Sequence, residues 1–167
     1  MDSVPVKCER PDVYSAGSPP YADLRTMRSI LLINGPNLDL LGTREPHIYG
    51  SRSFEDYLIE LRSRFTVVDL TYQQSNVEGE LVDLLRKADA TFDGIVVNAA
   101  GYSHTSVALR DTIAVLKKPV VEVHISNIHA REEFRHHTLT GSVCAGVITG
   151  FGLDGYRLAV EHLLQRT

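Results

Sequence analysis

Short apolar runs alternate with amphipathic segments along most of the chain, from residue 29 to the C-terminus. Five runs are rich in branched aliphatic residues and bounded by turn residues, which predicts strands at 30–33, 66–72, 95–97, 120–123 and 143–149. Between them, apolar residues recur at intervals of three and four, as on one face of a helix. This spacing predicts helices at 53–65, through 81–88, at 105–116 and at 154–165, with a shorter helical piece near 132–135.

The alternation of strands and helices predicts the fold class. Ser53 can cap the first helix, and Ser75-x-x-Glu78 is a capping-box pattern ahead of the second. Repeated β–α units favour an α/β fold, here an open five-stranded parallel sheet with helices on both faces. The usual strand order for such a sheet is the flavodoxin-like 2-1-3-4-5.

Length, charge and cysteine content narrow the class of protein. With 167 residues and 43% hydrophobic content, the chain suits one domain at 29–167 with a single core. A net charge of −4 and the lack of any Lys/Arg run argue against nucleic-acid binding. No apolar stretch approaches the roughly 18 residues that span a bilayer. Cys8 and Cys144 cannot form a disulfide framework, so we expect free thiols in a cytoplasmic, reducing environment.

Residues 1–28 differ from the rest of the chain. Prolines at 5, 11, 19 and 20 interrupt any periodicity, and apolar residues are sparse. We expect a disordered extension, with Met27 as a possible start; a docking arm is the alternative.

A long polar segment, residues 34–50, follows the first predicted strand. Connections in α/β units usually take about 2–6 residues, and longer ones often bind ligands. Arg44 and Tyr49 lie on this segment, where a guanidinium could hold a phenolate. Polar clusters also follow the second, third and fourth strands, at 73–76, 98–104 and 124–127. Because ligands bind beyond the carboxyl ends of parallel strands, we expect a site at this edge.

Two other patterns suggest different functions. Gly150-x-Gly152-x-x-Gly155 matches the dinucleotide fingerprint, but too little chain follows it for a second strand, so we interpret it as a tight strand-to-helix turn. Histidines at 124, 129, 136 and 137 could suggest a zinc hydrolase. They lack paired cysteines and the helical His-x-x-x-His spacing, so we expect no metal site.

Motifs at successive strand ends resemble those of the type II 3-dehydroquinate dehydratase family. The resemblance covers about residues 30–164. It rests on these segments, in chain order: 34–37 with 40–42, 44–46 with 49–50, 74–79, 98–101, 104–106 with 109–111, 122–127 and 131–135. The segment 139–142 departs from the family, which usually carries an aromatic or a proline there.

The resemblance implies a lyase that dehydrates 3-dehydroquinate through an enolate, without a cofactor. Tyr49 would act as the base in its phenolate form, stabilised by Arg44. His124 would be the general acid, oriented by Glu122 two residues earlier on the same strand face. Asn37 would hold the water that faces the enolate oxygen.

The resemblance also implies a set of substrate-binding residues and an oligomer. Ile125 and Ser126 would bind the substrate carboxylate through backbone amides, and Arg131 would add positive charge. The ring hydroxyls would be bound by Asn98, His104 and Arg135. Asp111 would reach a neighbouring subunit's site in a homododecamer, a tetramer of trimers. The alternative from another class is a non-catalytic flavodoxin-like binding module, which would need no acid–base pair.

Overall fold

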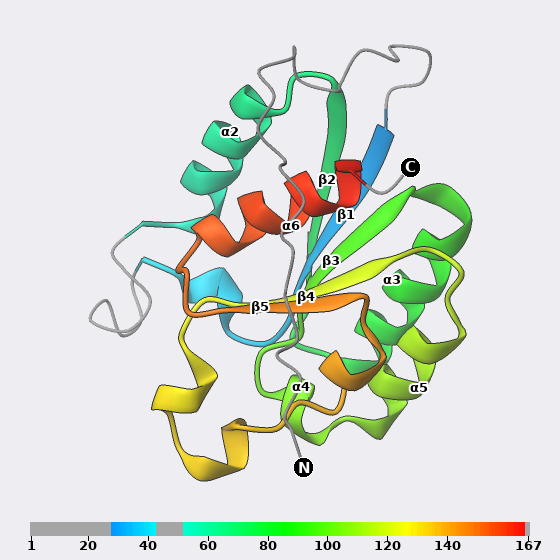
Figure 1. The fold of residues 1–167 in the computed structure, drawn as a ribbon. Helices are drawn as coiled ribbons and strands as arrows, with labels where there is room; N and C mark the ends of the chain where they lie inside the picture. The colour runs from blue at the N-terminus through cyan, green and yellow to red at the C-terminus, as the bar shows by residue number, and fades with distance from the viewer. Residues whose placement is uncertain (1–27, 43–51, 166–167) are drawn as a thin grey trace, which may run out of the picture.

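A five-stranded parallel sheet forms the centre of the protein, in a computed structural model that describes residues 28–42 and 52–165 (Figure 1). The strands are β1 (Arg28–Asn34), β2 (Val68–Gln74), β3 (Gly94–Asn98), β4 (Val120–His124) and β5 (Gly146–Thr149). Their order is β2-β1-β3-β4-β5, and every neighbouring pair is parallel. The predicted flavodoxin-like α/β sheet and its strand order are therefore confirmed.

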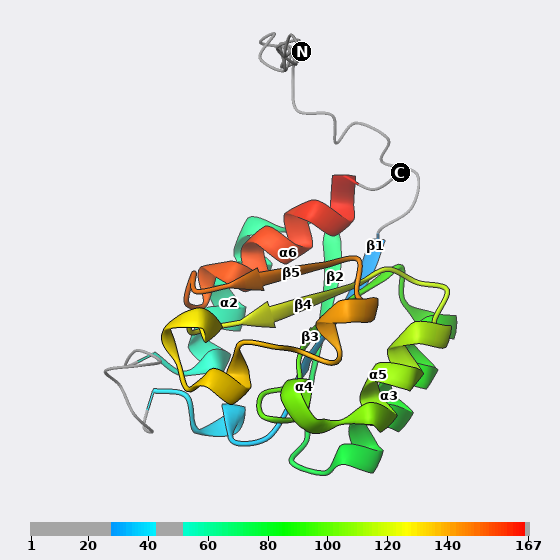
Figure 2. The same ribbon diagram turned by 60° about the horizontal axis from the view of Figure 1, so that its bottom comes forward.

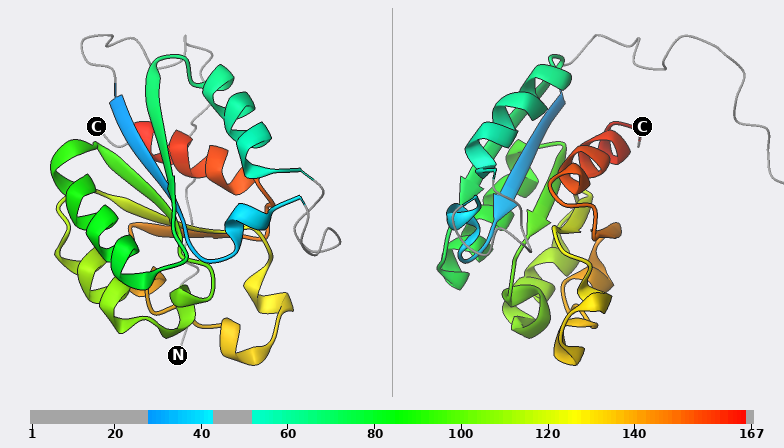
Figure 3. Two further views of the ribbon diagram at one scale, coloured as in Figure 1. Left: turned by 180° about the vertical axis from the view of Figure 1, so that it is seen from behind. Right: turned by 90° about the vertical axis from the view of Figure 1, so that its left-hand side faces the viewer.

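Helices cover both faces of this sheet. The helices are α2 (Phe54–Arg64), α3 (Glu78–Thr91), α4 (Tyr102–Thr105), α5 (Val107–Val115) and α6 (Asp154–Gln165). Short 3₁₀ turns are η1 (Leu38–Leu40), η2 (Ile128–Ala130), η3 (Glu133–Arg135) and η4 (Gly141–Val143). In Figure 1, α6 lies across the front of the sheet, and the rear view in Figure 3 shows α3 and α5 on the other side.

The two faces of the sheet bury separate apolar clusters, because successive strand residues point to opposite sides. On β1, Ile30 and Leu32 join the cluster that α2 and α6 cover, whereas Leu31 and Ile33 join the cluster under α3 and α5. Each strand of the sheet centre is thus apolar on both sides, which explains the uninterrupted apolar runs in the sequence.

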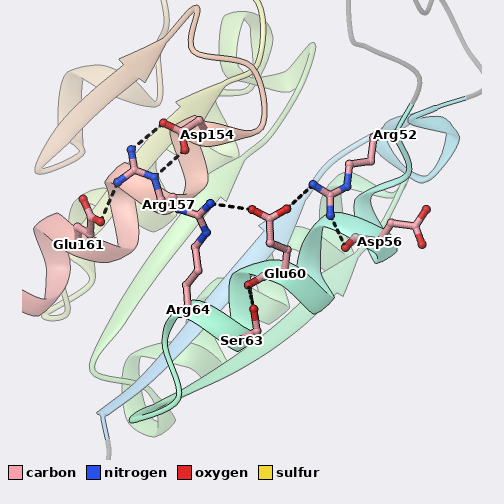
Figure 4. A network of polar contacts seen from close by, with 8 residues as sticks. All are labelled: Arg52, Asp56, Glu60, Ser63, Arg64, Asp154, Arg157 and Glu161. Carbon is pink, nitrogen blue, oxygen red and sulfur yellow. Dashed lines mark hydrogen bonds and ion pairs between the residues drawn. The ribbon is translucent and has the colours of Figure 1, made fainter.

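A local signal explains how α2 begins, and ion pairs lie on the outer surfaces of both α2 and α6. The Ser53 side chain accepts a hydrogen bond from the Asp56 backbone N–H at 3.1 Å, as the sequence predicts. On the outer surface, Glu60 of α2 pairs with Arg52 and Arg64, and Arg157 of α6 pairs with Asp154 and Glu161 (Figure 4).

Three element predictions need correction. The helix predicted at 105–116 is α5 and begins only at Val107, because Ser106 takes an extended conformation and its side chain caps the helix at the Leu109 N–H; the short helix α4 before it was not predicted. The capping box at Ser75 is wrong in detail: Val77 is the N-cap, and Ser75 Oγ accepts from the Val77 N–H.

The third correction concerns strand boundaries. The strand predicted at 143–149 begins only at Gly146, because residues 141–143 form the turn η4. The strand predicted at 66–72 lies two residues later, at Val68–Gln74, which the parallel register with β1 requires. The start of α6 at Asp154 and its end at Gln165 agree with the sequence prediction.

The predicted N-terminal extension falls outside the described residues, apart from Arg28. Arg28 is the first residue of β1, and its guanidinium donates to the Leu164 carbonyl at 2.7 Å. Within residues 28–42 and 52–165, every helix is too short or too polar to cross a lipid bilayer.

Candidate active site

Polar residues from several strands meet beyond the carboxyl edge of the sheet. In Figure 2 the arrowheads of β4 and β5 point to the end of the molecule where η1, η2 and η3 lie. A cavity of about 70 Å³ at this edge is lined by Leu38, Asn98, Ala100, Gly101, His104, His124, Ile125, Ser126, Ile128, Arg131 and Arg135. An adjoining cavity of about 170 Å³ shares Leu38, Ala100, Gly101 and Arg135 with it and adds Asn37. Parallel strands thus bring together residues that are far apart in sequence.

The end of β4 carries a buried acid–base pair. His124 Nε2 donates to Glu122 Oε1 at 2.7 Å, and the two side chains are only 6% and 0% exposed. The second carboxylate oxygen of Glu122 accepts a hydrogen bond from the buried Thr140 hydroxyl. Because Nε2 faces Glu122, the other ring nitrogen of His124, Nδ1, is the one that can face a ligand.

His104 lies beside His124 on the same side of the cavity. Their ring centroids are 5.7 Å apart, and His104 Nδ1 donates to the His137 carbonyl at 2.8 Å. Burial lowers the pKa of His104, the hydrogen bond to His137 partly offsets this, and positive charge at His124 and Arg135 lowers it further. A neutral His104 therefore presents Nε2 to the cavity as a hydrogen-bond acceptor.

Two arginines that line the same cavity provide positive charge. Arg131 donates to Ser126 Oγ at 3.3 Å and pairs with Glu132 at 3.4 Å, and Arg135 pairs with the same carboxylate at 2.9 Å. The side chains of Arg131 and Arg135 are only 18% and 28% exposed. Held guanidinium groups of this kind suit an anionic ligand such as a carboxylate.

Tight turns after β1 and β3 bring two loops together under the cavity. Gly35 donates its N–H to the Asn98 carbonyl at 2.8 Å, and a Cβ at Gly35 would lie 2.7 Å from the Ala99 backbone. Only glycine allows this close approach. Asn37 has a left-handed backbone, with φ at 65°, and its N–H donates to Asn76 Oδ1 at 2.8 Å.

A buried hydrogen-bond chain lies behind Asn98. Asn98 Nδ2 donates to the Tyr156 hydroxyl at 2.9 Å, and that hydroxyl donates to Asn34 Oδ1 at 2.7 Å. Asn34 Nδ2 in turn approaches the Tyr72 hydroxyl at 3.5 Å. Asn34 and Asn98 are register partners on β1 and β3, so their side chains project from the same face of the sheet, towards α6.

Most of the predicted site residues that the structure describes gather at this edge. Asn37 lines the second cavity, and Glu122 lies behind His124. The first cavity is lined by Asn98, His104, His124, Ile125, Ser126, Arg131 and Arg135. Asp111 does not join them: it is exposed on α5 and pairs with Arg110 at 2.8 Å. The predictions for Arg44 and Tyr49 lie outside the described residues, in 43–51.

Sequence reasoning missed the polar side chains that support the site from behind. Thr140 lies in the segment 139–142, which departs from the family pattern, and its hydroxyl donates to Glu122. Tyr156 is fully buried on α6, and a buried phenol usually needs a hydrogen-bond partner. A tyrosine on the apolar face of the last predicted helix therefore indicates a buried polar partner nearby, and this signal is present in the sequence.

The two competing patterns in the sequence have structural explanations. Gly150 and Gly152, with φ at 88° and 60°, form the turn between β5 and α6, as predicted. Among the residues that the structure describes, no three His, Cys, Asp or Glu side chains gather in a way that could hold a metal ion.

Comparisons with known proteins agree on one family. A family model described as dehydroquinase class II matches residues 28–164. A "3-dehydroquinate dehydratase" of an Exiguobacterium species is 53% identical over 137 residues, which is 81% of this chain and 94% of that protein. A "catabolic 3-dehydroquinase" of Aspergillus clavatus is 49% identical over 138 residues, which is 81% of this chain and 92% of that protein.

A solved structure shows the same likeness. The type II dehydroquinase of Propionibacterium acnes superimposes with a TM-score of 0.78 at 40% identity, covering 82% of this chain and 96% of that chain.

Proposed function

Because the chain belongs to the class II dehydroquinase family, we propose that the cavity beyond the carboxyl edge of its sheet is where it dehydrates 3-dehydroquinate. The chain is a hydro-lyase of this family, which removes water to form 3-dehydroshikimate in shikimate or quinate metabolism. The observation that carries the site is the buried Glu122–His124 pair on the cavity wall. A binding module without catalysis would have no use for such a pair.

His124 serves as the general acid in this proposal. Its Nδ1 delivers a proton to the leaving hydroxyl, so that water departs as the enolate collapses. Glu122 fixes the ring through Nε2 and balances the positive charge of the protonated imidazole. The low exposure of both side chains keeps bulk water away from this proton transfer.

Tyr49 serves as the base and takes the proton from the carbon next to the ketone. Arg44 lies close to it in sequence and stabilises the phenolate by its fixed positive charge, and Arg131 adds to that field. Asn37, which lines the adjoining cavity, holds the water that stabilises the enolate oxygen. In the net reaction one carbon–hydrogen and one carbon–oxygen bond break, a carbon–carbon double bond forms, and the proton and the hydroxyl leave as water, so no redox agent is needed.

The remaining cavity residues bind and orient the substrate. Ile125 and Ser126 offer backbone amides at the end of β4, and Ser126 adds its hydroxyl, for the substrate carboxylate. Asn98, His104 and Arg135 bind the ring hydroxyls. Correct orientation of the substrate lowers the barrier because the reacting groups no longer have to find each other.

We place Asp111 at a neighbouring subunit's site, in a homododecamer built from trimers. Its exposed position on α5, away from the cavity of its own chain, supports this role. We also place the enzyme in the cytoplasm, where the free thiol of Cys144 would stay reduced.

Two substitutions test the assignment of base and acid. Tyr49→Phe and His124→Gln should each lower kcat by about 100-fold or more, the usual worth of a positioned base or acid. Formation of the conjugated enone product, followed by ultraviolet absorbance, measures kcat, and equilibrium dialysis measures substrate binding, which should survive. Tyr102→Phe, which removes a hydroxyl bonded to the Asn76 carbonyl, is the control and should keep normal turnover. A kcat within tenfold of wild type in either variant contradicts that role.

A further inference from the structure

A fully buried phenol stands behind the cavity residue Asn98. Tyr156 is 0% exposed, and its hydroxyl lies between the side chains of Asn98 and Asn34. Of the elements that meet here, β1 and β3 supply the two asparagines and α6 supplies the tyrosine. None of the roles assigned above to the acid, the base or the carboxylate site uses this hydroxyl.

We propose that Tyr156 is a positioning residue, which sets the orientation of the Asn98 amide towards the substrate. The proposal rests on the function proposed above, in which Asn98 binds a ring hydroxyl. An asparagine amide can flip, because its oxygen and its NH₂ group have similar shapes. A flip would present an acceptor where a donor is required, so the orientation of Asn98 decides whether it can bind the substrate.

The directions of the hydrogen bonds around Tyr156 set that orientation. The Tyr156 hydroxyl has one proton, which it donates to Asn34 Oδ1 at 2.7 Å. Towards Asn98 it can therefore only accept, and it takes one N–H of Asn98 Nδ2 at 2.9 Å. Burial raises the pKa of the Tyr156 phenol, so the hydroxyl keeps its proton throughout the working pH range.

A second contact holds the other end of the same amide. Asn98 Oδ1 accepts the Ala100 backbone N–H at 3.2 Å, where Ala100 has a left-handed backbone with φ at 52°. With Oδ1 turned towards Ala100 and one N–H given to Tyr156, the second N–H of Nδ2 is the group that donates into the cavity. Ala100 lines both cavities, so the same amide also supports the loop beneath the substrate.

Removal of the Tyr156 hydroxyl should therefore act through Asn98. Tyr156→Phe keeps the ring packed against Phe54, whose ring centroid is 4.9 Å away, but removes both hydrogen bonds. The Asn98 amide then loses one of the two partners that distinguish its orientations, and only the 3.2 Å hydrogen bond from the Ala100 N–H remains. We expect KM for 3-dehydroquinate to rise about tenfold, since an interaction of about 1.4 kcal/mol is a tenfold change in affinity, while kcat falls much less.

The experiment is a double-mutant cycle measured by ultraviolet absorbance of the enone product. The variants are Asn98→Ala, Tyr156→Phe and the double variant, with Tyr57→Phe as control; its ring lies 6.3 Å from that of Tyr156. We expect Tyr156→Phe to change kcat/KM less than about twofold once Asn98 is alanine, because groups that act as one unit are not additive. Tyr57→Phe should keep KM at the wild-type value.

The possible outcomes separate the two proposals. Normal kinetics in Asn98→Ala would contradict the substrate-binding role of Asn98, whatever Tyr156 does. The positioning role of Tyr156 would be contradicted if Asn98→Ala lowers kcat/KM but Tyr156→Phe does not. It would also be contradicted if the two losses in kcat/KM multiply in the double variant.

A second cycle covers the case in which Tyr156→Phe does not fold. Asn34→Ala removes the acceptor that holds the Tyr156 proton, so that the hydroxyl can instead donate to a flipped Asn98. Its rise in KM should likewise vanish in the Asn98→Ala background, and multiplicative effects would overturn the proposal.

Discussion

Two groups of hydrogen-bonded charged side chains in this protein have similar contact distances, but one is buried and the other lies at the surface. Glu122 and His124 meet at 2.7 Å on β4 with 0% and 6% exposure, whereas Arg157 and Glu161 meet at 2.7 Å on α6 with 23% and 37% exposure. A second group of surface pairs lies at α2, where Glu60 pairs with Arg52 and Arg64 (Figure 4). Distance alone therefore does not distinguish the buried pair from the surface pair.

The surroundings decide what each network can do. At the surface, the hydrogen bond from Arg52 is the main reason that the pKa of Glu60 lies below its usual value, but water and salt screen these charges and the long side chains lose conformational entropy. Behind the cavity, Glu122 has no contact with water, and its two oxygens are held by His124 and Thr140. The buried network thus fixes the geometry of His124, whereas each surface pair links residues near in sequence and adds little to stability.

A Glu→Gln substitution in each network, at Glu122 and at Glu60, gives the sharpest test of this difference. Glu122→Gln should lower kcat by about 100-fold, because the neutral amide cannot balance the charge of a protonated His124. The ultraviolet assay measures kcat, and the thermal midpoint should show that the variant folds. A kcat within tenfold of wild type would mean that burial of this pair has no catalytic consequence.

Thr140→Val should have a smaller effect in the same network. It keeps the shape of Thr140 but removes the hydroxyl that Glu122 uses, so one carboxylate oxygen loses its partner. An unsatisfied buried acceptor costs about 1–3 kcal/mol of unfolding free energy, and kcat should fall several-fold as the carboxylate moves. Urea denaturation measures the first effect. Thr140→Ser, which restores the hydroxyl, should recover most of both losses; equal defects in the two variants would argue against the hydrogen bond.

The pH dependence of stability should report on His104, the partly buried imidazole that lies beside His124 of the buried pair. Its pKa is lowered from 6.5, mainly by burial, so as the pH falls the unfolded chain takes up this proton before the folded protein does. The stabilisation is therefore fully present above pH 6.5 and is lost as the pH falls towards the lowered pKa.

A pair of histidine variants checks this expectation. In His104→Asn the fall in urea midpoint between about pH 7.5 and pH 5.5 should be smaller than in wild type, because the asparagine does not titrate. His162→Asn, at an exposed position on α6, is the control and should keep the wild-type slope. If the urea midpoint of His104→Asn falls with pH as steeply as that of wild type, the imidazole of His104 does not contribute to the pH dependence of stability.

Glu60→Gln should have the smallest effect of all. It removes the central charge of the surface network, yet exposed pairs contribute little, so the thermal midpoint should shift by about 2 °C or less and kcat should not change. Differential scanning calorimetry at low and at about 1 M salt should show the shift disappear as screening increases. A large shift in thermal midpoint, or one that persists at high salt, would show that the surface pairs of Glu60 stabilise the fold as strongly as a buried pair.

The sequence by itself determined the fold class and predicted the edge of the sheet at which we propose the site, whereas the strand order was expected only as the usual one for a five-stranded sheet of this kind. The reason is that apolar periodicity and turn residues act locally, and that parallel strands must place their carboxyl ends together. It also determined the Glu122–His124 pair, since residues two apart on a strand share a face. The assignments of Arg44 and Tyr49 come from the family resemblance and stay predictions.

The tertiary structure decided what lies behind those residues. Thr140 is 18 residues from Glu122, and Tyr156 is 58 and 122 residues from Asn98 and Asn34, so no local pattern connects them. A buried polar group takes whichever partner the packing of distant elements brings within reach, and for that reason its hydrogen bonds are settled only when the whole sheet and its helices are assembled.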